Sequence, residues 1–317
     1  MKRKRVWRVT SLTVAGALLA GTGAFAVKGA ATRAGSTPLR GKIAFEGWPD
    51  EQEGAIFVAS ADGRHLRRET PFGAASPTWS PDGKRIAFAG ILNSGPGSGG
   101  PYIYIKSIAG KRIRRIAVGG EPNWDPDGGR LVYSVGYFSS GKIATVGLAG
   151  RHKHVFRLGV QAVFPDWSPD GRRIVFAGYK KATGSPSDIY VVNADGTHVH
   201  RLTKTATATD ESYEAHWSAD GSKIFFVWSK DNDVSQAFYE MDPDGGRLRR
   251  LAQIPPPSAL GGELRKGTSS WSVNGRIVMY CDGGGRIVAL RIGQPKPRVV
   301  RMKRHLVCES LDWHTSR

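Results

Sequence analysis

Short runs of alternating apolar and polar residues, separated by turn residues, make up most of this chain. Residues 165–176 show the pattern clearly: Pro-Asp-Trp-Ser-Pro-Asp-Gly-Arg-Arg-Ile-Val-Phe. Pro169 fixes φ near the value of the first turn position, and Gly171 can adopt the left-handed conformation that closes a tight hairpin. The pattern predicts two antiparallel strands, and no helical periodicity follows the N-terminal segment.

This hairpin unit recurs along the chain. Further copies lie at residues 77–88, 122–128, 215–221 and 270–275. A sixth tryptophan near the C-terminus completes the series, which has intervals of 42 to 54 residues: Trp79, Trp124, Trp167, Trp217, Trp271 and Trp313. A period of this size is typical of propeller blades. We expect these six tryptophans to be structural, packed between neighbouring blades.

Each unit continues with a second pair of strands. In the unit that contains Trp167, the apolar segment at residues 188–192 (Asp-Ile-Tyr-Val-Val) predicts a third strand, and an Asn-Ala-Asp-Gly turn follows it. Residues 197–203 predict a basic fourth strand. Four strands to a unit predict an all-β, six-bladed β-propeller over residues 41–317. The first segment of this region, residues 41–45, matches the second strand of the four-strand unit, and the last segment, around Trp313, matches its first strand. We therefore expect the C-terminal strand to complete the N-terminal blade and close the ring.

The repeated pattern Trp-Ser-Pro-Asp-Gly-Lys/Arg-x-Ile-Ala-Phe, followed by Ile-Tyr-Val-x-x-x-Asp-Gly, resembles the WD40-like (PD40) repeat of the TolB family. Similar repeats occur in the propellers of prolyl-oligopeptidase-type enzymes. The resemblance implies a TolB-like propeller and supports a binding module. The additional N-terminal α/β domain of TolB has no counterpart in the residues before the first repeat.

The first 26 residues have the features of a signal peptide. Five basic residues precede an apolar run at residues 9–27, and Ala24-Phe25-Ala26 is a small-x-small cleavage site. The alternative is an uncleaved N-terminal anchor. Residues 27–40 read as a flexible leader. We therefore expect an exported protein, periplasmic or extracellular and associated with the cell wall.

The chain is strongly basic, with a formal net charge of +19. The predicted fourth strands hold 20 of the 46 Lys and Arg residues. Basic residues on an outermost strand prevent edge-to-edge association, which agrees with a monomer. They could also bind an anionic wall polymer or a membrane surface. An exported protein has no access to nucleic acid, so we expect no nucleic-acid partner.

The sequence offers little for catalysis. No Gly-x-Ser-x-Gly nucleophile motif occurs, and the repeats leave no room for a hydrolase domain. Histidines fall mainly on the predicted outer strands, and metal ligands are not clustered, so we assign no catalytic residue, metal site or cofactor. A weak alternative is a cation such as calcium in the channel or in a loop, where Asp231-Asn-Asp233 is the candidate.

Cys281 and Cys308 are the only two cysteines. In an exported chain an even count predicts a disulfide, and two buried free thiols are the alternative.

The long connections should gather on one face and give it an acidic, aromatic mouth. The ligand-binding candidates there are Glu46, Trp48, Glu121, Tyr213, Glu214, Trp228 and Glu309. Carboxylates and aromatic faces suit a glycan or a cationic peptide. We expect a non-catalytic module that binds an envelope protein, peptide or glycan. The alternatives are a polysaccharide lyase or hydrolase that uses the mouth carboxylates, and an anionic-polymer binder that uses the basic outer strands.

Overall fold

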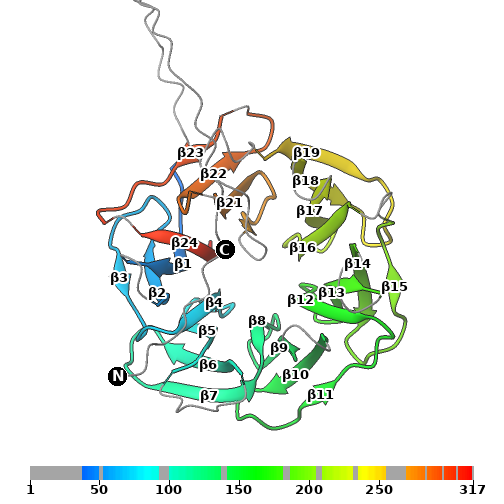
Figure 1. Cartoon of the computed structure of the whole chain (residues 1–317), viewed down its shortest axis with the longest axis horizontal. Coiled ribbons are helices and arrows are strands. Elements are labelled where there is room, and N and C mark those ends of the chain that lie inside the picture. Colours follow the sequence, from blue (N-terminus) through cyan, green and yellow to red (C-terminus); the bar gives the residue numbers. More distant parts are fainter. Residues whose placement is uncertain are drawn as a thin grey trace, which may run out of the picture. The chain divides into compact units, whose positions relative to one another are not determined.

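The repeats fold as antiparallel sheets arranged in a ring (Figure 1). The computed structural model describes residues 38–49, 53–92, 100–136, 141–180, 186–204, 209–230, 235–254, 269–282, 284–294, 296–304 and 306–315. These residues contain strands and turns but no helix, and hence no helix long and apolar enough to cross a membrane. Six sheets of four strands confirm the predicted six-bladed propeller.

The blades follow the chain in order. The first consists of β24 (Val307–His314), β1 (Lys42–Trp48), β2 (Ala55–Ser60) and β3 (Arg67–Arg68). The second consists of β4 (Ala74–Trp79), β5 (Arg85–Gly90), β6 (Tyr102–Ser107) and β7 (Ile113–Val118). The third consists of β8 (Gly120–Trp124), β9 (Arg130–Val135), β10 (Lys142–Gly147) and β11 (His154–Val155).

The fourth blade consists of β12 (Gln161–Trp167), β13 (Arg173–Tyr179), β14 (Ser187–Asn193) and β15 (His200–Arg201). The fifth consists of β16 (Glu211–Trp217), β17 (Ile224–Lys230), β18 (Ser235–Met241) and β19 (Arg249–Gln253). The sixth consists of β20 (Ser269–Trp271), β21 (Ile277–Cys281), β22 (Ile287–Arg291) and β23 (Arg298–Val299). The first-named strand of each blade is its inner strand, and the last-named is its outer strand.

The Ser-Pro-Asp-Gly turns hold themselves together with side-chain hydrogen bonds. In the fourth blade, Ser168 Oγ donates to Asp170 Oδ1 over 2.5 Å and accepts from the backbone N–H of Arg173 over 2.9 Å. Gly171 has a φ of 69°, the left-handed value expected from the sequence. These inner turns and the outer Asp-Gly turns lie on one side of the ring, here called the turn face. The opposite side is the loop face.

Each repeated tryptophan lies at or near the turn-face end of an inner strand. Trp79, Trp124, Trp167, Trp217 and Trp313 are 4–7% exposed, and Trp271 is half-buried. At three junctions an arginine of one blade stacks on the tryptophan of the next, with 4.6–5.0 Å from Cζ to the ring centroid: Arg85 on Trp124, Arg130 on Trp167 and Arg173 on Trp217. These stacks join blades through apolar area and cation–π attraction.

The ring closes as the sequence predicts. β24 pairs antiparallel with β1, with Trp313 opposite Ile43, and Figure 1 shows the red and dark blue strands side by side. A disulfide between Cys281 of β21 and Cys308 of β24 links the sixth blade to the first, with a Cα–Cα distance of 5.5 Å. The closure therefore depends on strand pairing and on one covalent link between neighbouring blades.

The outer strands carry the basic residues at the rim. In β3, β7 and β19 the pairs Arg67–Arg68, Arg114–Arg115 and Arg249–Arg250 are exposed. Such residues keep an unpaired strand edge from associating with another edge.

Deleting residues 306–317 tests the closure. The truncated chain loses β24 and exposes the buried faces of β1 and β21, so we expect cooperative unfolding to be lost instead of local fraying. Differential scanning calorimetry measures this, and a control that lacks only residues 316–317 should melt like the parent. A parent-like transition in the longer deletion would show that β24 does not close the ring.

The disulfide is tested by replacing Cys281 and Cys308 with serine. Because the link closes a loop of 27 residues, its loss should reduce the free energy of unfolding by about 3 kcal/mol in denaturant titrations. Two thiols that react in the unreduced, unfolded protein would contradict the assignment.

Candidate functional site

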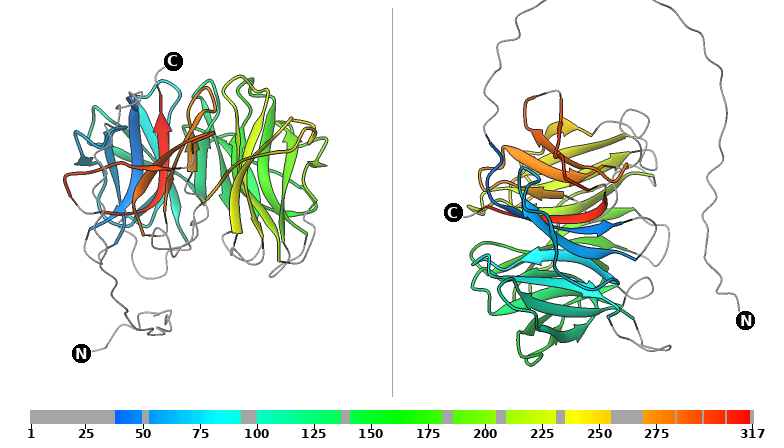
Figure 2. Two further views of the ribbon diagram at one scale, coloured as in Figure 1. Left: turned by 90° about the horizontal axis from the view of Figure 1, so that it is seen from above. Right: turned by 90° about the vertical axis from the view of Figure 1, so that its left-hand side faces the viewer.

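The six inner strands surround a cavity of about 610 Å³. Figure 1 shows β4, β8, β12, β16 and β24 around the centre of the ring, and Figure 2 shows the strands running between the two faces of the disc. Every blade contributes to the lining. We call this space the channel.

A β-bulge in four of the inner strands turns consecutive side chains toward the channel. Ser76, Glu121, Phe164 and Glu214 each lie three positions before the repeated tryptophan and have φ of 50–52°. The pairing with the second strand skips at this point in all four blades. A left-handed φ at a non-glycine residue is uncommon, and a bulge redirects the residues around it. Side chains three, two and one positions before the tryptophan consequently all line the channel.

The residues directly before the tryptophans form a polar belt around the channel, which we call the inner ring: Thr78, Asn123, Asp166, His216, Ser270 and Asp312. Members of the inner ring accept hydrogen bonds from the next blade. Asp312 Oδ2 accepts from Trp79 N over 2.7 Å, and Asp166 Oδ2 accepts from Trp217 N over 2.9 Å. Ser270 Oγ accepts from Trp313 N over 3.1 Å. The inner ring thus satisfies backbone donors that no further strand could reach.

Asp166 and His216 are the members whose pKa values shift most. Burial raises the pKa of Asp166 to about 7, and the negative charge of Asp312 adds to the shift. Burial lowers the pKa of His216 to about 4, against the opposing attraction of Asp312. His216 Nδ1 lies 3.8 Å from Asp166 Oδ2. At neutral pH His216 is therefore uncharged, and Asp166 is close to half protonated.

Four glutamates line the loop-face half of the channel: Glu46, Glu121, Glu214 and Glu309. Glu46 accepts hydrogen bonds from Ser310 Oγ over 3.0 Å and Trp48 Nε1 over 3.1 Å. Burial raises its pKa, and the charge of Glu309 contributes to the rise.

Two of the other glutamates, Glu121 and Glu214, join neighbouring blades. Glu121 Oε2 accepts from Ser134 Oγ over 2.6 Å and from Phe164 N, in the next blade, over 3.0 Å. Glu214 Oε2 accepts from Ser269 Oγ, also in the next blade, over 2.7 Å. Glu214 is 2% exposed, whereas Glu121 and Glu309 are partly exposed toward the channel.

The channel lining is acidic although the chain is basic. Its described residues include six carboxylates and two histidines but no lysine or arginine, in a chain of net charge +19. Carboxylates held in a narrow polar space create a negative potential that attracts a cationic group. The channel can therefore hold an ammonium or guanidinium group against several acceptors.

The seven mouth residues expected from the sequence all lie within strands, not in loops, because the strands extend further toward the loop face than expected. Four of them meet in the channel: Glu46, Glu121, Glu214 and Glu309. The three aromatic candidates do not line it.

Each aromatic candidate packs elsewhere. Tyr213 is fully buried in the core, and its hydroxyl accepts a hydrogen bond from Gln236 Nε2 over 2.9 Å. Trp228 packs beside Phe226 and Tyr239 at the edge of another core cluster. Trp48 is half-buried and donates to Glu46. Tyr213 is therefore corrected from a mouth residue to a core residue, whereas Trp48 and Trp228 are partly exposed and lie outside the channel lining.

Sequence reasoning missed Asp166, Asp312 and most of the inner ring. A signal existed, because the position before each tryptophan is polar in every repeat, from Thr78 to Asp312. The proposed loop cation site, Asp231-Asn-Asp233, lies outside the described residues. Within the described ranges, no three His, Cys, Asp or Glu residues are placed to hold a metal ion.

The fold and the channel define a β-propeller with an acidic axial site. The family model described as the TolB beta propeller domain (PD40) matches residues 121–302. The chain belongs to this family.

Known proteins extend the comparison. The Tol-Pal system protein TolB of Alcanivorax borkumensis is 34% identical over 88 residues, 25% of this chain and 19% of that protein. The solved TolB of Acinetobacter baumannii aligns with a TM-score of 0.62 and 21% identity over 86% of this chain and 66% of that one. An oligogalacturonate lyase in complex with manganese aligns with a TM-score of 0.55 and 14% identity over 81% of this chain and 73% of that one.

These likenesses establish the propeller fold. The chain spans about a fifth of the length of its curated relative (19%), and the solved structures are too distant in sequence to indicate more than the fold.

The shifted pKa values predict opposite pH dependences for two variants. Between pH 4 and about 7 the folded state binds a proton at Asp166 that the unfolded state has released, so this group makes stability fall as pH rises. Between pH 4 and 6.5 the unfolded state binds a proton at His216 that the folded state lacks, so this group makes stability rise.

The two contributions oppose each other in the parent protein. Relative to the parent, Asp166→Asn should therefore gain stability as pH rises from 4 to 6.5, and His216→Gln should lose it. Each difference should be at most about 1.4 kcal/mol per pH unit. Urea titrations at several pH values measure the slopes, and slopes of the same sign in both variants would refute the assignment.

Proposed function

We propose that this protein is an exported, non-catalytic binding module that takes a positively charged segment of an envelope protein into its channel. The observation that carries the proposal is the lining: six carboxylates and no lysine or arginine among its described residues, inside a strongly basic molecule. The basic exterior repels a cationic ligand, so binding should be confined to the channel.

The geometry favours a peptide over a glycan. A cavity of about 610 Å³ falls in the range of small-ligand sites and has room for a few side chains. Sugars usually need a broad exposed aromatic face, but Trp79, Trp124, Trp217 and Trp313 are 4–7% exposed, and Phe164 and Trp271 in the lining are only partly exposed. A lysine, arginine or terminal amine can instead interact with Glu121 and Glu309, which are partly exposed.

The hydrogen bonds in the channel favour binding over catalysis. A glycosidase or lyase needs one carboxyl group free to give or take a proton. Asp166 already accepts from Asn123 Nδ2 over 2.8 Å on one oxygen and from Trp217 N on the other. Asp312 accepts from Ser270 on one oxygen and from Trp79 on the other. These carboxylates are committed to joining blades.

The family and the N-terminal segment support the location and the kind of partner. Its curated relative is named a Tol-Pal system protein, which agrees with a role among envelope proteins. Residues 1–26 carry the signal-peptide features that export requires.

A labelled lysine-rich hexapeptide provides the test. Fluorescence anisotropy at low ionic strength should show binding, and acetylation of the lysines should abolish it because the ammonium charges are lost. The variants Glu121→Gln and Glu309→Gln keep the hydrogen-bonding shape but remove charge, and together they should weaken binding about tenfold or more.

The matched control is Glu53→Gln, an exposed acidic residue outside the channel lining, which should bind like the parent. Equal weakening by Glu53→Gln would indicate a general charge effect instead of a channel site. Tight binding of a neutral oligosaccharide, unaffected by the Glu121 and Glu309 changes, would replace the peptide with a glycan ligand.

A further inference from the structure

The junction between the fifth and sixth blades lacks the arginine–tryptophan stack found at the three junctions from the second to the fifth blade. In blades two to four, the residue six positions after the tryptophan is an arginine that covers the next tryptophan, as Arg173 covers Trp217 at 4.6 Å. The fifth blade has Lys223 at this position. Lys223 does not cover Trp271; its Nζ donates to Asp242 Oδ1 over 2.5 Å.

Phe225 takes over the missing contact. Its ring stacks on Trp271 with 4.3 Å between centroids and an interplanar angle of 14°. The equivalent positions in blades two to four hold the small residues Ala87, Val132 and Val175. Gly275 passes so close above Phe225 that a Cβ there would lie 2.6 Å from the ring. Phe225 therefore occupies the face of Trp271 that an arginine covers at the other junctions, and a space lined by Phe225, Lys223 and Gly275 lies beside it.

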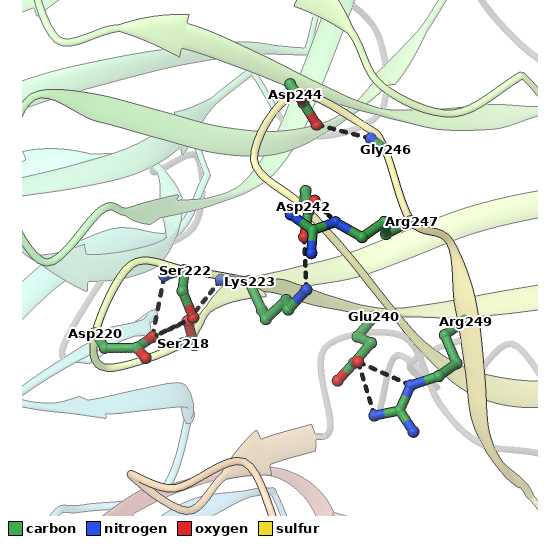
Figure 3. Close-up of polar contacts among 10 residues, drawn as sticks. All are labelled: Ser218, Asp220, Ser222, Lys223, Glu240, Asp242, Asp244, Gly246, Arg247 and Arg249. Carbon is green, nitrogen blue, oxygen red and sulfur yellow. Dashed lines mark hydrogen bonds and ion pairs between the residues drawn. The ribbon is translucent and has the colours of Figure 1, made fainter.

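An ion-pair network fixes one wall of this space (Figure 3). Asp242 binds Lys223 and also accepts from Arg247 Nε over 2.6 Å. Arg249 pairs with Glu240 over 2.8 Å. In the same view Asp220 turns back to its own turn, where Ser218 Oγ, Ser222 N and Ser222 Oγ all donate to Oδ1.

The result is a groove of about 570 Å³ on the turn face, between the fifth and sixth blades. Its other wall carries Arg276 and Arg291, and in the described part of the chain neither has a carboxylate within 4.0 Å. Val273 (45% exposed), Leu251 and Ile292 add apolar surface. Four cationic residues line the groove against two acidic ones, Asp220 and Glu240.

We propose that this groove is a second ligand site, which binds a carboxylate or phosphate group carried on a small apolar body. A guanidinium fork matches the geometry of both oxyanions, and the two arginines on one wall, which have no carboxylate partner among the described residues, can bind the same group. The apolar residues beside them provide contact for the rest of the ligand. The groove would take a negatively charged ligand and the channel a positively charged one, so the two proposed sites differ in ligand.

The test uses four probes at constant ionic strength: phenyl phosphate, benzoate, inorganic phosphate and neutral benzamide. Isothermal titration calorimetry should detect phenyl phosphate, benzoate or both, and benzamide should not bind. Binding of phenyl phosphate alone identifies a phosphate ligand, and binding of benzoate alone identifies a carboxylate ligand. Each of Arg276→Gln and Arg291→Gln should weaken binding about tenfold, as expected for loss of a charge-assisted hydrogen-bonding group.

Two further variants sharpen the result. Arg172→Gln changes the residue equivalent to Arg276 in the fourth blade, which is exposed and outside the groove, and should bind like the parent. The double change Lys223→Arg, Phe225→Val recreates the residues of blades two to four and removes the Phe225 side of the groove, so binding should weaken.

The proposal is overturned if neither aromatic anion binds at about 10 mM, where even millimolar affinity would be visible. It is also overturned if Arg172→Gln weakens binding as much as Arg276→Gln does.

Discussion

The backbone donors of the inner strands are the constraint on which this propeller depends. Each inner strand faces the axis, where no fifth strand can pair with it, and an unpaired buried N–H is strongly unfavourable. Side-chain acceptors of the preceding blade bind these donors: Asp312 accepts from Trp79 N, and Glu121 accepts from Phe164 N. Acceptors, and especially carboxylates, must therefore stand along the axis.

The same constraint produces the chemistry of the channel. Carboxylates that join blades also give the axis its negative potential, and basic residues are left to the rim, where Arg67 and Arg114 are exposed. Repulsion among the acids is reduced because Asp166 is partly protonated near pH 7. A cationic ligand would relieve the remaining repulsion. The stability of the ring and the proposed affinity for a cation would thus have one origin.

Local chemistry explains why the fold could be predicted and much of the site could not. The hairpins, the blade count and the closure follow from turn residues and from one tryptophan per repeat. The glutamates near strand ends were also within reach, as Glu309 shows. The bulge before the tryptophan changes which side chains face inward, so Tyr213 was wrongly placed at the mouth. The open groove depends on a contact between blades, Phe225 on Trp271, which no pattern within one repeat reveals.

A crystal structure of the protein with a bound lysine-containing peptide tests most directly whether the acidic channel holds a positive group. An ammonium group should lie inside the channel, within hydrogen-bonding distance of Glu121 or Glu309. Two results would contradict this proposal. The peptide could bind on the outer rim, or it could enter the channel with its backbone, and not its ammonium group, against the carboxylates.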